Sequence, residues 1–215
     1  MAVELDPGEM GTRRFYRLLT AVVVPRPIAW VSSRSAAGVD NLAPHSFFTV
    51  ACADPPILQF TSVGVKDTLR NVEETGEFVV CLAPEPLFEE INATATDYPP
   101  GTSEFDAVGL ERAPSLRVAP PRVAASPVAL ECRLHSTLPL GDSTVVLGLV
   151  VHAAVADGIV VDGHPEIDRL RPLARLGKNQ WTGVGEVRAI PRIRYADIAQ
   201  DGDRDGDGGA GRGAS

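Results

Sequence analysis

The chain has 215 residues, of which 44% are hydrophobic and 22% charged, and its formal net charge is −8 at pH 7. This length fits one domain with at most a short appendage, and the composition excludes a wholly disordered, collagenous or coiled-coil chain. The acidic balance argues against broad electrostatic binding to nucleic acid or to anionic lipid.

No part of the sequence predicts export or membrane insertion. Residues 1–6 are acidic and lack the basic and apolar regions of a signal peptide. The longest uncharged stretch, residues 143–156, is shorter than the ~20 residues that a membrane-spanning helix needs. We therefore expect a cytoplasmic protein with no membrane segment, in which residues 1–14 are an N-terminal extension.

Short Val-rich runs between frequent prolines and glycines predict a mainly β protein. Strand length and β-branched or aromatic content predict strands at residues 28–34, 46–53, 57–63, 77–83, 143–155 and 159–162. In residues 127–138, apolar side chains alternate with Glu131, Arg133 and His135. This pattern predicts an antiparallel strand with these three side chains on an exposed face.

Two short helices are predicted among the strands. Residues 66–75 carry apolar side chains three positions apart and stop at Gly76, a common helix terminator, and residues 86–96 form the second helix. Residues 113–127 hold four prolines and are predicted to be an extended surface connection. Many short strands with few helices favour a closed barrel or a sandwich over a doubly wound sheet.

The C-terminal segment is rich in glycine and aspartate. Residues 201–215 contain no large apolar side chain, so they cannot bury enough surface to offset the entropy lost on ordering. We predict a disordered tail over residues 199–215 and one folded domain over residues 15–198.

The spacing of cysteine and histidine predicts no metal site. Cys52, Cys81 and Cys132 lie far apart among apolar neighbours, which favours buried thiols over disulfides or metal ligands. The four histidines have no ligand spacing either. Because hydrolase, zinc-protease and phosphate-loop motifs are absent from the sequence, an enzyme built on it would take its reactive atom from a cofactor.

Residues 61–68 (Thr-Ser-Val-Gly-Val-Lys-Asp-Thr) end a predicted strand and begin a predicted helix. The N-terminus of a helix offers unpaired N–H groups and the positive end of its dipole. Hydroxyl groups from Ser62 and Thr68 and the Lys66 ammonium would complete a phosphate site there. The alternative is that Asp67 or Thr68 merely caps the helix.

Residues 25–33 are a second segment with two interpretations. Two prolines hold the backbone extended around Arg26, which could reach an anion, and the small Ala29 would let a flat ring approach the backbone. The alternative is an ordinary start of a strand with Trp30 in the core.

Taken together, these segments resemble the flavin reductase-like family, whose members bind FMN on a split β-barrel. The resemblance runs from about residue 15 to residue 195. Its most specific pieces are Pro-Arg-Pro-Ile-Ala-Trp-Val-Ser at 25–32 and Asn-Leu-Ala-Pro-His-Ser-Phe-Phe at 41–48, with further matches at 54–56, 66–71, 75–80 and 126–132. The resemblance implies a Greek-key split barrel that forms a homodimer, with each flavin site near the subunit interface.

Carried over by position, the resemblance implies four groups of cofactor contacts. The residues implied to lie along the flavin are Arg26, Pro27, Ile28, Ala29 and Trp30. Those implied to line the ring and the ribityl chain are Asn41, Ala43 and Ser46. Those implied to hold the phosphate are Ser62, Lys66 and Thr68. Leu176 and Gly177 belong to a late Arg-Leu-Gly element that closes over the cofactor region in this family.

Three positions depart from the family's pattern. His45 stands where an aromatic residue is common, Thr49 where asparagine is common, and Lys178 where a second glycine is usual. We expect all three near the flavin or the substrate pocket, where they bear on the identity of the substrate more than on FMN binding.

The resulting prediction is an FMN-binding oxidoreductase, most simply an NAD(P)H:flavin reductase in which hydride passes from nicotinamide C4 to flavin N5. FAD is an alternative flavin. The reaction requires orientation rather than an acid–base side chain, so no catalytic residue is assigned. Two other functions stay open: a biosynthetic flavoenzyme that keeps its FMN and acts on another small molecule, and a non-enzymatic electron carrier. Candidate partners are a second copy of the chain, a nicotinamide or other small substrate, and a monooxygenase.

Overall fold

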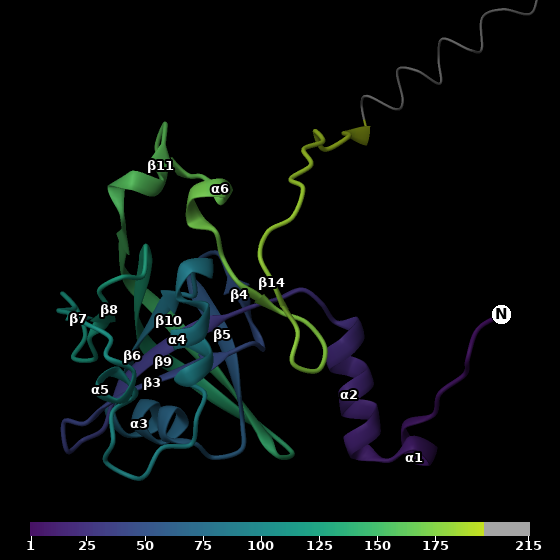
Figure 1. Ribbon diagram of the computed structural model, residues 1–215, viewed down its shortest axis with the longest axis horizontal. Coiled ribbons are helices and arrows are strands. Elements are labelled where there is room, and N and C mark those ends of the chain that lie inside the picture. Colours follow the sequence, from purple (N-terminus) through teal and green to yellow (C-terminus); the bar gives the residue numbers. More distant parts are fainter. Residues whose placement is uncertain (196–215) are drawn as a thin grey trace, which may run out of the picture. The chain divides into compact units, whose positions relative to one another are not determined.

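The computed structural model describes residues 1–195, and Met1–Gly185 form one compact unit built around a curved β-sheet with short helices packed beside it (Figure 1). The predicted tail and the predicted end of the folded domain at residue 198 lie outside the described residues. The mainly β class with a few short helices is confirmed.

Seven antiparallel strands form the main sheet, in the order β3-β2-β6-β9-β10-β5-β4. These strands are β2 (Ala29–Arg34), β3 (Asp40–His45), β4 (Phe48–Cys52), β5 (Ile57–Val63), β6 (Glu77–Leu82), β9 (Val128–Leu140) and β10 (Ser143–Val155). The long hairpin of β9 and β10 lies at the centre and joins the two halves of the sheet.

The two edge strands of this sheet, β3 and β4, are consecutive in the chain and are joined only by Ser46 and Phe47. The main-chain N–H of Thr61 in β5 donates to the carbonyl of Phe47 at 2.9 Å. The sheet therefore curls until β3 comes into contact with β5. In the described part of the chain no strand ladder joins β3 to β4, so the curled sheet stays open along this seam.

Smaller elements complete the unit. The helices are α1 (Pro7–Met10), α2 (Thr12–Val22), α3 (Asp67–Thr75), α4 (Phe88–Ala93), α5 (Glu104–Val108) and α6 (Ile167–Leu170), with 3-10 turns at Glu85–Leu87 and Asp157–Ile159. A three-stranded sheet consists of β1 (Arg26–Pro27), β13 (Ala174–Arg175) and β14 (Trp181–Thr182). Two strand pairs are β7 (Arg112–Ala113) with β8 (Arg122–Val123) and β11 (Val160–Val161) with β12 (His164–Pro165). None of the described helices is long and apolar enough to cross a membrane.

Apolar side chains are buried on both faces of the sheet. Trp30 of β2 belongs to one cluster, with Val79 and Phe105, while its neighbour Val31 belongs to the other, with Phe60. Alternate residues of a strand point to opposite faces, so β2 is buried on both sides, and its buried residues include Ser32 and Ser33 as well as the apolar ones. This confirms the interpretation that placed Trp30 in the core.

Gly148 of β10 lets the second cluster pack. A Cβ at this position would lie 2.2 Å from Cζ of Phe78, which is 1% exposed. The register of β10 against β9 shifts between Leu147 and Gly148, so the glycine coincides with an irregularity of the ladder. Phe78 occupies the space that any side chain at this position would need.

Several predicted boundaries are wrong. The predicted strand at 46–53 is shorter, as β4, and the strand before it, β3, was not predicted because the polar residues and the proline of 40–45 conceal an edge strand, where proline is tolerated. The predicted helix at 86–96 is a 3-10 turn followed by α4, and the strand at 159–162 is reduced to β11. Helix α2 runs across the boundary placed at residue 15.

Glu131 of β9, predicted on an exposed face, is completely buried. Its carboxylate accepts hydrogen bonds from the main-chain N–H groups of Leu116 and Arg117, at 3.0 and 2.6 Å, and from the guanidinium of Arg122. The segment 113–127 is therefore held against the sheet, with Val123 only 1% exposed. The prediction that this segment is a surface connection is wrong for its central part.

The three cysteines are free thiols, as expected, but only two of them are buried. Burial raises the pKa of Cys81 and of Cys132 to about 12, so neither forms a thiolate near neutral pH. Cys52 on β4 is partly exposed, which corrects its predicted burial.

Candidate functional site

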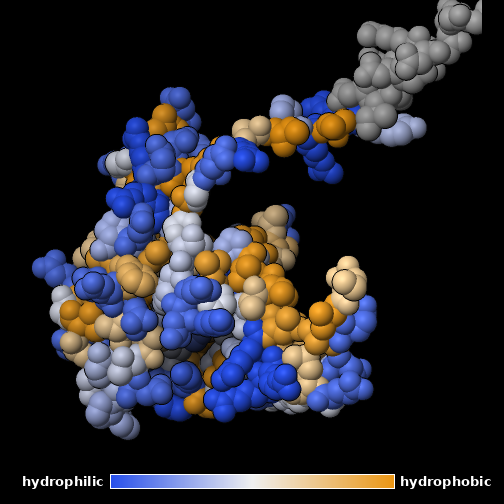
Figure 2. All heavy atoms as spheres, turned by 45° about the vertical axis from the view of Figure 1, so that its right-hand side comes forward, coloured by the Kyte–Doolittle hydropathy of each residue, from blue (hydrophilic) through white to orange (hydrophobic). Residues whose placement is uncertain are grey.

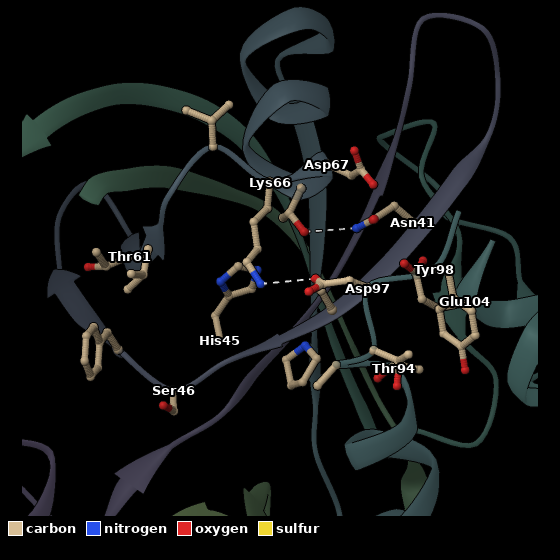
Figure 3. Close-up of a pocket in the computed structure, with 18 of the residues that line it drawn as sticks. Asn41, His45, Ser46, Thr61, Lys66, Asp67, Thr94, Asp97, Tyr98 and Glu104 are labelled. Atoms are coloured by element: carbon tan, nitrogen blue, oxygen red, sulfur yellow. Dashed lines mark hydrogen bonds and ion pairs between the residues drawn. The ribbon is translucent and has the colours of Figure 1, made fainter. Parts of the chain in front are cut away.

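A cavity of about 390 Å³ opens where the curled sheet brings β3 and β5 together at the N-terminus of α3 (Figure 3). Its volume falls within the ~300–1,000 Å³ of small-molecule sites. The predicted site residues that line it are Asn41, Ala43, His45, Ser46, Lys66 and Thr68. The structure thus brings together residues from two segments that are separated by two strands, β4 and β5, in the sequence.

The N-terminus of α3 is open toward this cavity. Lys66 is the N-cap residue and makes no capping hydrogen bond, the carboxylate of Asp67 pairs with Arg70, and Thr68 lines the cavity. The alternative that Asp67 or Thr68 merely caps the helix is therefore wrong. The first N–H groups of the helix keep their capacity to bind an anion.

A tight turn brings Lys66 to this position. Gly64 adopts the left-handed conformation (φ 76°), its N–H donates to the carbonyl of Asp142 at 2.8 Å, and its carbonyl accepts from the Ser62 hydroxyl at 2.9 Å. The Lys66 ammonium lies 3.5 Å from a carboxylate oxygen of Asp97, and both side chains are mostly exposed. An exposed ion pair of this kind is weak, so an anionic ligand can compete for the ammonium.

Buried amides fix the floor of the cavity beside the helix. The amide nitrogen of Asn41 donates to the hydroxyl of Thr68 at 2.9 Å, and that of Asn71 donates to the hydroxyl of Ser33 at 3.1 Å. These side chains are all nine-tenths buried or more. The network ties β2 and β3 to α3, so the helix N-terminus is held in place before any ligand binds.

His45, the last residue of β3, is a buried titratable side chain that lines the cavity. Its ring packs on Phe60 at a centroid distance of 4.8 Å, and the residue is 8% exposed. Burial lowers the pKa of His45 to about 4, the Thr61 main chain opposes this effect, and the Lys66 ammonium adds to it. His45 is therefore neutral at pH 7, and its Nε2 atom has no hydrogen-bond partner.

No sequence pattern predicts the residues on the other side of the cavity. This side is lined by Thr94, Asp97 and Tyr98 from the segment after α4 and by Glu104 at the start of α5 (Figure 3). Burial raises the pKa of Glu104, and the N–H of Leu42 donates to its carboxylate at 2.8 Å. These residues belong to short helices and turns whose residue types resemble those of any polar loop.

The residues of 26–30 do not line the cavity. Ile28, Ala29 and Trp30 are packed in the core, and Pro27 is exposed on β1. The Arg26 guanidinium donates to the carbonyls of Thr20, Val23 and Leu176, so it fastens α2 to the late Arg-Leu-Gly element. Trp30 does not line the cavity itself, but its Nε1–H donates to the hydroxyl of Thr94, a lining residue, at 2.9 Å.

Five more predicted site residues lie outside the lining. Ser62 points away from the cavity, since alternation along β5 turns Thr61 and Val63 toward it instead. Gly177 packs against Ala21 of α2, and Leu176 and Lys178 belong to the same turn. Thr49 is exposed on the edge strand β4. The expectation that Thr49 and Lys178 adjoin the pocket is not met within this chain.

Within residues 1–195, no three His, Cys, Asp or Glu side chains come together to hold a metal ion.

Comparisons with known proteins give one consistent result. Residues 21–166 match the model of the flavin reductase like domain. An uncharacterized protein, BH2278, from Halalkalibacterium halodurans is 39% identical over 202 residues, which cover 88% of this chain and 96% of that protein.

Solved structures extend the likeness to the fold. Nitrilotriacetate monooxygenase component B from Bacillus cereus has 32% identity and a TM-score of 0.85, covering 88% of this chain and 99% of that one. The 2-nitrobenzoate 2-nitroreductase NbaA from Pseudomonas fluorescens has 28% identity and a TM-score of 0.84, covering 90% and 98%. A split barrel domain from Shewanella frigidimarina shares the fold, with 20% identity and a TM-score of 0.79 over 86% and 96% of the two chains.

Proposed function

Because the chain belongs to the flavin reductase-like family, we propose that it binds FMN in the cavity at the N-terminus of α3 and acts as an NAD(P)H:flavin reductase. Bound flavin would supply the redox chemistry by accepting the hydride that the nicotinamide nucleotide donates. The residues of the chain then have to bind and orient the two reactants.

The open N-terminus of α3 is the observation that supports this proposal most directly. Helix N–H groups, the Lys66 ammonium and the Thr68 hydroxyl converge on one end of the cavity, and no side chain caps the helix. This set of donors suits a phosphate group. Asn41, Ala43 and Ser46 line the adjoining wall along β3, and we propose that the ribityl chain and the ring lie against them.

The proposed reaction assigns no proton transfer to the protein. The ionisable groups of the lining differ in kind, with a neutral His45, a buried Glu104 and the exposed pair of Lys66 and Asp97. Positive charge and N–H groups lie at the helix end, where they favour a ligand that carries an anion. In the proposed reaction, the charged and N–H groups of the cavity bind and orient the ligand.

The direct test is nicotinamide oxidation by the purified protein. We expect NADH or NADPH oxidation to rise with added FMN and to saturate with an apparent affinity of ~10⁻⁶ M, since a reductase that releases its flavin cannot hold it very tightly. The assay is run in air and anaerobically, with loss of the flavin absorbance as the anaerobic signal. Flavin that binds but is bleached by neither nucleotide would exclude the reductase.

A second candidate is a flavoenzyme that keeps its FMN and reduces another small molecule. The likeness to a 2-nitrobenzoate 2-nitroreductase, at 28% identity over nearly the whole of both chains, favours this alternative specifically. Such an enzyme would retain flavin through purification, and added FMN would not raise its rate. The same titration therefore separates it from the reductase, while an electron carrier would show neither activity.

The reduced flavin could serve a second protein. The likeness to component B of a nitrilotriacetate monooxygenase supports the proposal that a monooxygenase uses the flavin that this chain reduces. In that case the flavin has to leave the cavity, which agrees with the modest affinity expected above.

We also propose that the working form is a homodimer. Helix α2 has no buried residue, and Tyr16, Leu19, Val22 and Val23 are all 46–62% exposed. Figure 2 shows apolar side chains continuing from the body of the unit onto this helix. Exposed apolar surface of this kind marks contact sites between proteins, and Tyr16 also lines the cavity.

Sedimentation velocity tests the dimer. We expect a particle of twice the 22.8 kDa chain mass at micromolar concentration. Replacing Leu19 and Val22 on α2 with glutamate should shift the particle to monomer mass, since charges would have to be buried at the contact. A wild-type protein that sediments only as a monomer would contradict the proposal.

A further inference from the structure

His45 combines burial, an unpartnered nitrogen and a place in the cavity lining. Its Nε2 is a buried side-chain atom without a hydrogen-bond partner, although the residue is 8% exposed and lines the cavity. Buried polar atoms are nearly always paired in folded proteins, and each exception calls for an explanation. A ligand in the cavity would supply the missing partner.

The other ring nitrogen is already in use. The Thr61 main chain acts as a hydrogen-bond partner that raises the pKa of the imidazole, and because Nε2 has no partner, we assign this contact and the ring proton to Nδ1. In the neutral ring, one nitrogen carries the proton and the other is a bare acceptor. Nε2 is therefore an acceptor that faces no donor.

The imidazole belongs to the same corner of the cavity as the helix N-terminus. Figure 3 shows His45 on β3 and Lys66 at the start of α3 extending to the same region, and the Lys66 ammonium acts electrostatically on the imidazole. Helix α3 has nine residues and no capping side chain. A phosphate bound at that helix end would meet Lys66 on one side and His45 on another.

We propose that His45 is a proton-linked ligand of the FMN phosphate, so that binding of a phosphate monoester at the N-terminus of α3 takes up one proton. The inference rests on the proposed flavin function. A phosphate oxygen and Nε2 are both acceptors, so a hydrogen bond between them requires one added proton. Burial holds the pKa of His45 at about 4 before a ligand binds, so the bound phosphate dianion has to raise that pKa above the working pH for the proton to be taken up.

The same reasoning predicts a preference for FMN over FAD. The phosphates of FAD form a diphosphate diester with one negative charge on each phosphate, whereas the FMN phosphate is a dianion above its second pKa, so FAD stabilises a protonated His45 less. FMN should therefore gain over FAD as the pH falls from 8.5 to 7, while riboflavin, which has no phosphate, should bind independently of pH in this range.

Other charged groups line this corner of the cavity, and their contribution to the pH dependence of FMN binding has to be distinguished from that of His45. Lys66, Asp67 and Arg70 come from the start of α3, and Asp97 comes from the segment after α4. Burial raises the pKa of Glu104 of α5, so a variant of Glu104 is needed as a control for the pH dependence. Tyr16 of α2 and Tyr98 also line the cavity, and imidazole is the side chain that ordinarily titrates between pH 6 and 8.

The test is equilibrium binding of FMN, FAD and riboflavin, followed by flavin fluorescence between pH 7 and 8.5, where the free phosphate stays ionised. In the wild type, the ratio of FMN to riboflavin affinity should fall ~30-fold over this range of about 1.5 pH units, the slope of one proton. Calorimetry in buffers of different ionisation enthalpy should register uptake of about one proton per FMN at pH 7.

Two variants identify the group that binds the proton. His45→Phe keeps a ring to pack on Phe60 but removes the nitrogen, so the pH slope and the proton uptake should disappear while riboflavin affinity is retained. His45→Gln serves the same purpose if the phenylalanine variant fails to fold. Glu104→Gln should leave the slope unchanged.

Three outcomes of these experiments would contradict the proposed role of His45. A flat FMN-to-riboflavin ratio in the wild type, a slope that persists in both His45 variants, or a slope lost in Glu104→Gln would overturn it. If FMN is reduced by NAD(P)H but shows no proton uptake, only the role of His45 fails. If the protein binds neither FMN nor riboflavin, the proposed function fails with it.

Discussion

Replacing Lys66 with alanine is expected to weaken FMN binding by ~10- to 150-fold and to leave riboflavin binding nearly unchanged. A charge-assisted hydrogen bond is worth ~1.5–3 kcal/mol, and each ~1.4 kcal/mol is tenfold in affinity. Riboflavin shares the ring and the ribityl chain of FMN but has no phosphate for the ammonium to bind. Fluorescence titration with both ligands measures the difference directly.

Arg133→Ala is the matched control for this experiment. Arg133 on β9 is 61% exposed and lies 4.0 Å from Glu77, whereas Lys66 is 57% exposed and lies 3.5 Å from Asp97. Both substitutions remove an exposed cation from a weak ion pair, but only Lys66 lines the cavity. Equal losses of FMN and riboflavin in Lys66→Ala would mean that Lys66 supports the structure rather than the phosphate.

Replacing Glu131 with alanine is expected to lower the free energy of unfolding by ~3–5 kcal/mol. The substitution leaves the Arg122 guanidinium and the N–H groups of Leu116 and Arg117 without their acceptor in a buried setting. Removing one partner of a buried ion pair typically costs this much. Urea unfolding followed by tryptophan fluorescence measures the loss as a lower midpoint.

The control is Glu77→Ala, which acts on the same segment from an exposed position. The Glu77 carboxylate accepts from the N–H of Ala119 at 2.8 Å but is itself partly exposed. We expect its removal to cost no more than ~1 kcal/mol, as for other exposed pairs. A comparable loss in both variants would show that burial of Glu131 contributes nothing special.

Glu131 also makes a pH dependence testable. Burial acts to raise its pKa, but the hydrogen bonds from Leu116, Arg122 and Arg117 outweigh burial and hold the pKa below its ordinary value of 4.5. The carboxylate therefore adds stability that is present above that value and is lost as the pH falls through the lower, folded-state pKa. The stability of Glu131→Ala should change less than that of the wild type in this acid range.

The cavity shows which parts of the site could be read from local sequence. The turn at Gly64 and the helix that starts after Lys66 are encoded by neighbouring residues, so the segment 61–68 alone predicts the helix start at which we propose a phosphate site. Asn41 and His45 were placed at the site only through the family resemblance. Nothing in their local pattern indicates that β3 comes into contact with β5.

Burial of polar side chains was decided by tertiary structure. Alternation along β9 predicts that Glu131 faces solvent, because a strand pattern records which residues share a face but not what covers that face. The segment 113–127 covers it, and three residues of that segment donate hydrogen bonds to the carboxylate. Glu104 is concealed in the same way, since its surroundings come from β3, some sixty residues earlier.

The sequence by itself determined the mainly β class, the positions of β5, β10 and α3, and the helix end that suits a phosphate. These features depend on side-chain periodicity and turn residues, which act over a few positions. The tertiary structure decided that Arg26 ties α2 to Leu176, that Ser62 points away from the cavity, and that Nε2 of His45 has no partner. These facts depend on how segments far apart in the chain pack together, and a local sequence pattern does not record that packing.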